Sequence, residues 1–165
     1  MKKNIIGFLV LFTGLIGIFW LTGTKQKENS PAPITPSGKG NLSADVSAYD
    51  FGIVSMAKGN VMYQFKIKNT GEDPVTISKM YTSCMCTTAK LITDNGEWGP
   101  FGMPGHGIIS NINAALPPQK EATIEAIFDP NAHGPAGVGR IERIITVEQN
   151  GASPLELHFS ANVTP

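Results

Sequence analysis

The chain has 165 residues, enough for one domain, and its 13 basic and 13 acidic residues give no formal net charge. A neutral chain without a basic, aromatic-interleaved motif excludes nucleic acid as an expected partner. The 18 glycines and 12 prolines favour short strands and turns over helices.

Residues 1–24 predict a signal anchor. Lys2 and Lys3 precede an uncharged run of 18 residues, Ile5 to Thr22. As a helix this run would span about 27 Å, close to the hydrocarbon thickness of a bilayer. It is longer than the apolar core of a cleaved signal peptide, so we expect an uncleaved transmembrane helix, with cleavage as the alternative. Either way, the rest of the chain is expected outside the cytoplasm, in the periplasm or at the cell surface.

Residues 25–44 predict a disordered linker. They are rich in proline, serine and lysine and show no apolar periodicity, so they cannot bury enough surface to fold. The folded domain is therefore expected over residues 45–165.

From Asp45 onward, apolar residues alternate with polar ones between turn residues. A glycine- and proline-rich connection over 93–107 interrupts this pattern, and its length indicates a functional loop or an insertion. About seven antiparallel strands predict an all-β, immunoglobulin-like sandwich, preceded by the single transmembrane helix. We expect these strands at 49–54, 60–68, 75–80, 108–116, 122–128, 140–148 and 155–163.

Four motifs follow one another in the order seen in a bacterial family: Phe51-Gly52-Ile53-Val54, Phe65 to Gly71, Ser83 to Thr87, and Phe128-Asp129. On these motifs, residues 45–163 resemble the family catalogued as domain of unknown function 1573. The resemblance implies an extracytoplasmic sandwich similar to PapD and ASH domains, and it implies no activity. The chain departs from the family pattern at Met85, where glycine is common, and in its Met103-Pro104-Gly105-His106 loop.

Cys84 and Cys86 are the only cysteines of the chain. In a flat strand their Cα atoms would lie about 6.6–7 Å apart, at the limit for a disulfide. A modest bend at the strand end would bring both sulfurs to one metal ion. The spacing therefore favours a chelate over a structural disulfide. A reversible dithiol/disulfide pair and merely structural thiols stay open as alternatives.

Soft sulfur ligands suit Cu(I), and thioether and imidazole ligands from the long loop would complete such a site. Zinc is less favoured and would take both cysteines with His106 and His133. The expected ligands are Cys84, Cys86, Met103 and His106, with Met80, Met85 and His133 in reserve.

Three functions of different classes follow. The first is a membrane-anchored extracytoplasmic binding domain that chelates a soft metal at the Cys-x-Cys loop. The alternative is a non-catalytic interaction or assembly module with structural cysteines, whose open sheet edges receive another extracytoplasmic protein. The third is a thiol-redox protein. Because no nucleophile elbow or phosphate-binding loop is recognisable, we expect no other enzymatic activity.

Overall fold

The computed structural model describes residues 41–106 and 109–165, which form ten strands and two short 3-10 helices. In chain order these elements are β1 (Leu42–Ala44), β2 (Ala48–Ser55), η1 (Met56–Lys58), β3 (Val61–Asn69), β4 (Val75–Thr82), β5 (Thr87–Thr93), β6 (Gly96–Phe101), β7 (Ala114–Leu116), β8 (Glu121–Phe128), η2 (Gly134–Gly137), β9 (Gly139–Gln149) and β10 (Leu155–Thr164).

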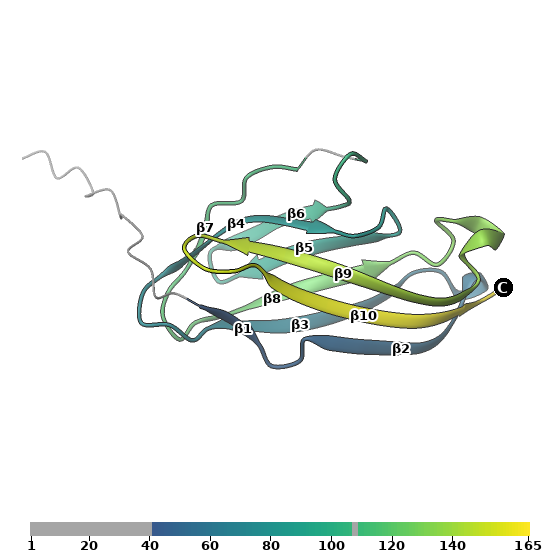
Figure 1. Ribbon diagram of the computed structural model, residues 1–165, viewed down its shortest axis with the longest axis horizontal. Coiled ribbons are helices and arrows are strands. Elements are labelled where there is room, and N and C mark those ends of the chain that lie inside the picture. The colour runs from purple at the N-terminus through teal and green to yellow at the C-terminus, as the bar shows by residue number, and fades with distance from the viewer. Residues whose placement is uncertain (1–40, 107–108) are drawn as a thin grey trace, which may run out of the picture. The chain divides into compact units, whose positions relative to one another are not determined.

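The strands form two five-stranded sheets, in the orders β1-β3-β8-β5-β6 and β2-β10-β9-β4-β7. Figure 1 shows the two sheets stacked on each other. The predicted all-β sandwich is therefore confirmed. Neighbouring strands are antiparallel throughout, except that β2 runs parallel to β10.

The predicted number of about seven strands is wrong, because β1, β5 and β6 have no counterpart among the predicted strands. β1 has three residues, too few for alternation to be recognised, and the apolar Ala89, Leu91 and Ile92 of β5 do not alternate strictly. β6 pairs with β5 within the segment predicted as a long connection, and its Gly96, Gly99 and Pro100 are residues that strands normally avoid. Of the strand predicted over 108–116, the described part, 109–116, forms a strand over Ala114–Leu116.

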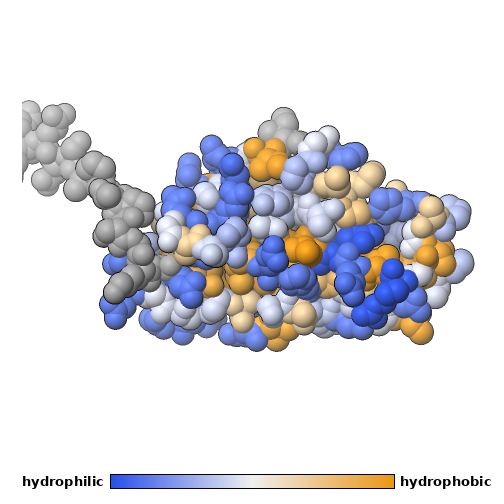
Figure 2. Space-filling view, viewed as in Figure 1, coloured by the Kyte–Doolittle hydropathy of each residue, from blue (hydrophilic) through white to orange (hydrophobic). Residues whose placement is uncertain are grey.

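The core lies between the sheets and contains the alternate residues that the period-two pattern selects. Phe65 and Ile67 of β3, Ile124 of β8 and Leu157 of β10 are at most 1% exposed, and they belong to one cluster. Phe159 of β10, which is 2% exposed, packs with aromatic rings from β2 and β8. On the face seen in Figure 2, apolar residues appear as scattered spots among hydrophilic ones.

Asn69, at the end of β3, is a fully buried polar residue that joins three segments. Its Nδ2 donates to the carbonyls of Asp73 at 2.8 Å and Leu116 at 2.9 Å. Its Oδ1 accepts from the N–H of Gly71 at 3.0 Å. The Asn-Thr-Gly motif thus ties the β3–β4 turn to β7.

The predicted signal anchor, 1–24, and most of the predicted linker lie outside the described residues. Within 41–106 and 109–165, no helix is both long and apolar enough to cross a membrane. The end of the predicted linker needs correction, because residues 42–44 form β1 and pair with β3. The sandwich therefore begins before Asp45.

Candidate functional site

The two cysteines lie in the turn that carries the chain from β4, in one sheet, to β5, in the other. The Cys84 carbonyl accepts from the N–H of Thr87 at 3.1 Å. The buried hydroxyl of Thr82 is shared between the carbonyls of Cys84 and Thr87, at 3.0 Å from each. This turn brings the Cα atoms of Cys84 and Cys86 to 5.3 Å, and the two residues form a disulfide.

The cysteines do not lie in a flat strand, because β4 ends at Thr82 before the first of them, and the chain bends at the strand end as expected. The observed Cα separation of 5.3 Å falls inside the range of ordinary disulfides. In this structure the two cysteines are therefore in the disulfide state, which the sequence leaves open as an alternative to the metal chelate.

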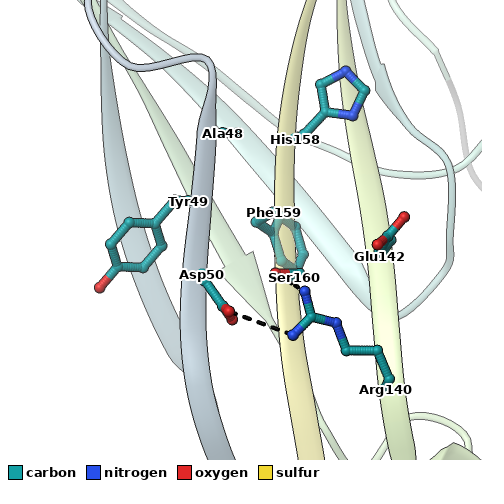
Figure 3. Close-up of a pocket in the computed structure, with 8 residues that line it drawn as sticks. All are labelled: Ala48, Tyr49, Asp50, Arg140, Glu142, His158, Phe159 and Ser160. Atoms are coloured by element: carbon teal, nitrogen blue, oxygen red, sulfur yellow. Dashed lines mark hydrogen bonds and ion pairs between the residues drawn. The ribbon is translucent and has the colours of Figure 1, made fainter.

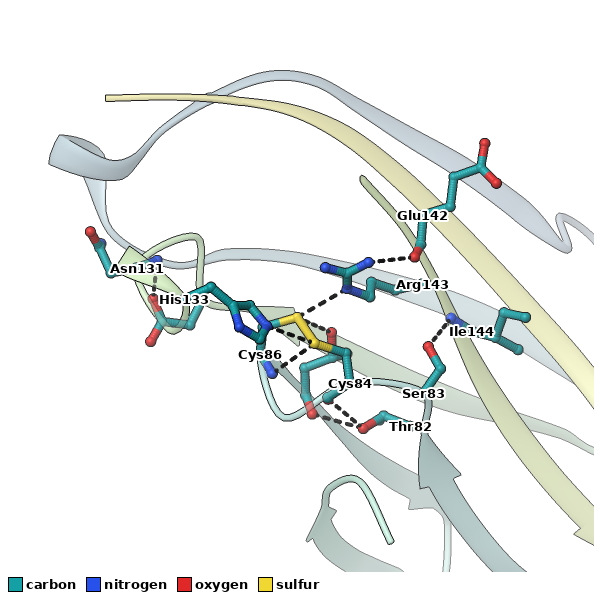
Figure 4. The surroundings of a disulfide bond; sticks show 11 residues. Thr82, Ser83, Cys84, Cys86, Asn131, His133, Glu142, Arg143 and Ile144 are labelled. Atoms are coloured by element: carbon teal, nitrogen blue, oxygen red, sulfur yellow. Dashed lines mark hydrogen bonds between the residues drawn. A yellow bond between two sulfur atoms is a disulfide. The ribbon is translucent and has the colours of Figure 1, made fainter. Parts of the chain in front are cut away.

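Each sulfur has a nitrogen from another element beside it, as Figure 4 shows. The Sγ of Cys84 lies 3.1 Å from Nε2 of His133, and Nε of Arg143 donates to the Sγ of Cys86, also at 3.1 Å. Cys84 is 9% exposed and Cys86 is 2% exposed, so Cys84 is the more accessible of the two. Both nitrogens are placed to stabilise negative charge on sulfur when the disulfide is reduced.

Arg143 occupies an inward-facing position of β9, in step with the buried Ile145 and Val147. Its partial burial lowers the pKa of the guanidinium group below its ordinary value. Its Nη1 donates to the Glu142 carbonyl at 2.7 Å. Among the described residues, no carboxylate forms an ion pair with Arg143. The polar group opposite its Nε is a cysteine sulfur.

His133 reaches the disulfide from the loop between β8 and β9. The N–H of Asp129 donates to the Cys86 carbonyl at 2.9 Å, which fastens this loop to the cysteine turn. The side chain of Asn131 donates to the Met56 carbonyl in η1 at 2.8 Å. The cysteine turn and the loops that contain η1 and η2 therefore meet at one end of the sandwich (Figure 1). At this end, Phe128 of β8 pairs with the first residues of β3 and β5.

The structure brings together three of the predicted metal ligands. The Sγ atoms of Cys84 and Cys86 and a ring nitrogen of His133 lie within 4.8 Å of one another. His133 was only a reserve ligand in the sequence prediction. This donor set of two sulfurs and one imidazole suits Cu(I) or zinc once the cysteines are reduced to thiolates.

The other predicted histidine ligand, His106, does not join this group, and the predicted methionine ligands differ in burial. His106 is exposed and outside the group of His, Cys and carboxylate ligands, and its N–H bonds to the Met103 carbonyl at 3.1 Å. Met103 is half-buried. Met80 is fully enclosed in the core, and Met85 is 49% exposed at the turn.

Arg143 is the site residue that sequence reasoning missed. Its signal was present, because Ile141, Ile145 and Val147 define the inner face of this strand and Arg143 falls on the same face. A charged residue at a core position needs a partner. Only the fold shows that this partner is Cys86, 57 residues away in sequence.

A separate hollow of about 440 Å³ lies on β2, β9 and β10, and Figure 3 shows its lining. Arg140 lies 3.4 Å from Asp50 and 3.1 Å from Ser160. The N–H of Gly52, together with these neighbours, lowers the pKa of Asp50. Because side chains alternate along a strand, Arg140 points to this hollow whereas Arg143 points to the disulfide.

Comparison with solved structures shows the same fold in a protein of unknown function from Porphyromonas gingivalis W83. The TM-score is 0.55 at 18% identity, over 81% of this chain and 51% of the other. This chain thus spans about half the length of that protein. The ASH/PapD-like domain 7 of human CEP192 gives a TM-score of 0.43 at 12% identity, over 74% of this chain and 84% of that domain. The periplasmic chaperone SfaE gives 0.39 at 9% identity, over 76% and 59%.

No curated protein matches the chain. A family model, described as "Protein of unknown function (DUF1573)", matches residues 42–99. This region includes three of the four motifs that suggested the resemblance, the Cys-x-Cys segment among them. The predicted resemblance is confirmed: over residues 42–99 the chain carries the sequence signature of the DUF1573 family of unknown function.

Proposed function

We propose that Cys84 and Cys86 form a reversible thiol–disulfide redox centre in an extracytoplasmic domain anchored to the membrane by residues 1–24. The observation that carries this proposal is the contact between Nε of Arg143 and the Sγ of Cys86 at 3.1 Å. The half-buried Arg143 guanidinium has no carboxylate partner, and it gains an anionic partner when Cys86 becomes a thiolate. The surroundings therefore favour the reduced state.

A purely structural role explains this disulfide poorly. It joins residues two apart in sequence, so it closes a loop of only three residues. By the chain-entropy relation, such a crosslink stabilises the fold by about 1.6 kcal/mol, against about 3 kcal/mol for a fifteen-residue loop. Most of the fold is held instead by the core between the sheets, in which both cysteines take part.

The exchange reaction can be assigned to the two sulfurs. An incoming thiolate attacks the more exposed Cys84, forms a mixed disulfide with it, and releases Cys86 as a thiolate beside Arg143. A second thiol then attacks the sulfur of the first, so that Cys84 leaves as a thiolate beside His133. Two electrons pass from the external thiols, which form a disulfide, to the cysteine pair.

An oxidising compartment is consistent with this chemistry, because disulfides persist outside the cytoplasm. The apolar N-terminal segment supports the same location. A partner-stabilised thiolate makes a disulfide a stronger oxidant, because the reduced form is stabilised. We therefore infer that the site oxidises or exchanges the thiols of other molecules.

The test is a redox titration of the full-length protein against glutathione buffers, with trapped thiols counted by mass-tagged alkylation. Because the chain has two cysteines, the oxidised protein takes no tag, the mixed disulfide with glutathione takes one and the reduced protein takes two. We expect a reversible transition at a potential above about −300 mV, the region below which structural disulfides normally lie. A pair that stays oxidised throughout that range would overturn the proposal.

A second candidate function is soft-metal binding by the reduced site. The clustering of both Sγ atoms and a His133 ring nitrogen within 4.8 Å favours it. Cu(I) is the preferred ion and zinc the alternative, with the thioether of Met103 as a candidate further ligand, while His106 lies outside the group of clustered donors. The test is competition for Cu(I) between the reduced protein and a chromophoric chelator. One-to-one binding that is lost in Cys84→Ser and His133→Asn is expected, and no competition would overturn this candidate.

The interaction-module alternative predicts that the cysteines are dispensable. In that case a Cys84→Ser/Cys86→Ser protein would bind its partner as well as the native protein does. Loss of partner binding in the double variant would instead assign the cysteines a chemical role.

A further inference from the structure

β9 has a free edge next to the disulfide. Its pairing with β4 runs from Gln149 to Ile145, and one further contact joins Ser83 to Ile144. β4 then gives way to the cysteine turn, while β9 continues to Gly139 with only β10 beside it. In the part of the chain that the structure describes, residues 139–143 have no strand partner on this side.

Hydrogen bonds on β9 show which backbone groups face this free edge. The N–H of Ile144 donates to Ser83 Oγ, and its carbonyl accepts from the N–H of Ser83, both at 2.9 Å. Backbone groups alternate in direction along a strand, so those of Glu142 and Arg140 face the same side. An unpaired edge of this kind is a template for an added strand.

The edge is connected directly to the disulfide. The Glu142 carbonyl accepts from Nη1 of Arg143 at 2.7 Å, and Nε of the same guanidinium donates to Cys86 Sγ at 3.1 Å. Figure 4 shows this chain of contacts from the edge of β9 to the sulfur. A carbonyl oxygen has two lone pairs, so that of Glu142 can keep Arg143 and still receive a second donor.

We propose that the β9 edge at Arg140 and Glu142 docks an extended, cysteine-containing segment of another polypeptide and presents its thiol to Cys84. The proposal rests on the proposed redox function. An extended chain satisfies the free backbone groups by strand addition. Its thiolate is complementary in charge to the Arg143 guanidinium beside Cys86, and the His133 ring lies beside Cys84. Edge and disulfide together thus define the substrate class as protein thiols rather than small thiols.

The reaction on a docked substrate follows the scheme above. The substrate thiolate forms a mixed disulfide with Cys84 and Cys86 leaves as a thiolate. A second cysteine of the same substrate then attacks its own sulfur in the mixed disulfide and releases Cys84. The substrate gains an internal disulfide, and the Cys84–Cys86 pair takes up the two electrons.

The test compares rates of reduction of the full-length protein by two synthetic peptides. Both have seven residues with one central cysteine between valine and threonine, and one is N-methylated at the flanking residues so that it cannot pair as a strand. We expect the unmethylated peptide to react at least tenfold faster, after each rate is corrected for the pKa of the peptide thiol. Equal rates would overturn the docking edge.

Glu142 supplies a matched pair of variants. Glu142→Pro removes an N–H that faces the free edge, at a position where an edge strand tolerates proline. Glu142→Ala removes the same carboxylate but keeps the N–H. Rates are normalised to reduction by dithiothreitol for each variant. The preference for the unmethylated peptide should disappear in Glu142→Pro and persist in Glu142→Ala, and its persistence in both would contradict the proposal.

Reduction by dithiothreitol and glutathione distinguishes failure of the redox function from failure of the docking edge. A pair that these small thiols cannot reduce and reoxidise refutes the redox function and the docking edge together. A reversible pair without any preference between the peptides refutes the docking edge alone.

Discussion

Replacing Arg143 by methionine is the most direct perturbation of the site. The variant keeps most of the aliphatic length but loses the donor that lies 3.1 Å from Cys86 Sγ. A hydrogen bond to a charged group is worth about 1.5–3 kcal/mol, and the lower end applies to a side chain that is partly open to solvent. About 1.5 kcal/mol corresponds to a potential about 30 mV more negative, and to a rise of about one unit in the pH at which Cys86 becomes reactive.

Both quantities can be measured on the full-length protein. The glutathione titration reports the potential, and the pH profile of alkylation by iodoacetamide reports thiolate formation. Arg143→Lys should recover part of the shift, because it restores the charge without the planar donor group. Lys79→Met, which removes a charge on β4 paired with Glu148 at 4.0 Å, serves as the control.

The stability of the oxidised protein separates a redox role from a structural one. An unpaired, half-buried charge does not favour the oxidised fold, so Arg143→Met should leave its free energy of unfolding unchanged or slightly raised. Unchanged potential and alkylation profile, with a clear loss of stability, would refute the reasoning and make Arg143 a structural residue.

Three further changes have defined outcomes. Reduction of the Cys84–Cys86 disulfide should lower the free energy of unfolding by no more than about 1.6 kcal/mol in denaturant titrations. A much larger loss of stability would show that the disulfide has a structural role. His133→Asn should slow thiol attack on the disulfide by about two- to fivefold in stopped-flow assays, in proportion to the modest net contribution of one hydrogen bond, and an unchanged rate would exclude His133 from the exchange. Asn69→Ala should destabilise the protein by about 3 kcal/mol or more, since it leaves buried partners at the β3–β4 turn and β7 unsatisfied; a loss below about 1 kcal/mol would show that water replaces the amide.

The sandwich was predictable because long strands alternate visibly. β3, β8 and β10 each show apolar residues at every second position, and those residues are the buried ones. β1, β5 and β6 were missed for physical reasons. A three-residue strand such as β1 has no period to detect, and the apolar residues of β5 do not alternate strictly. Glycine and proline in β6 are tolerated because it lies at the edge of its sheet.

The site was predictable only in part. The Cys-x-Cys segment is distinctive in sequence, and the structure places His133 and Arg143 beside its two sulfurs. Its geometry was not predictable, because the position at which β4 ends determines whether the cysteines lie in a strand or a turn. The choice of His133 over His106 depends on the β8–β9 loop, which the backbone of Asp129 fastens to Cys86. Such contacts over long sequence distances leave no local pattern.

The redox and metal proposals are linked by mass action, and this link makes them testable against each other. An ion that binds the two thiolates and His133 but not the disulfide stabilises only the reduced state. At a free concentration 100-fold above its dissociation constant, it contributes about 2.7 kcal/mol, which raises the apparent potential by about 60 mV. A titration with a thiol-free mediator at buffered free Cu(I) should therefore shift upward with metal concentration, and the shift should vanish in His133→Asn if the imidazole is a ligand. If the reduction potential stays unchanged while Cu(I) still binds, the ion binds at other residues. The cysteine pair would then serve thiol exchange alone.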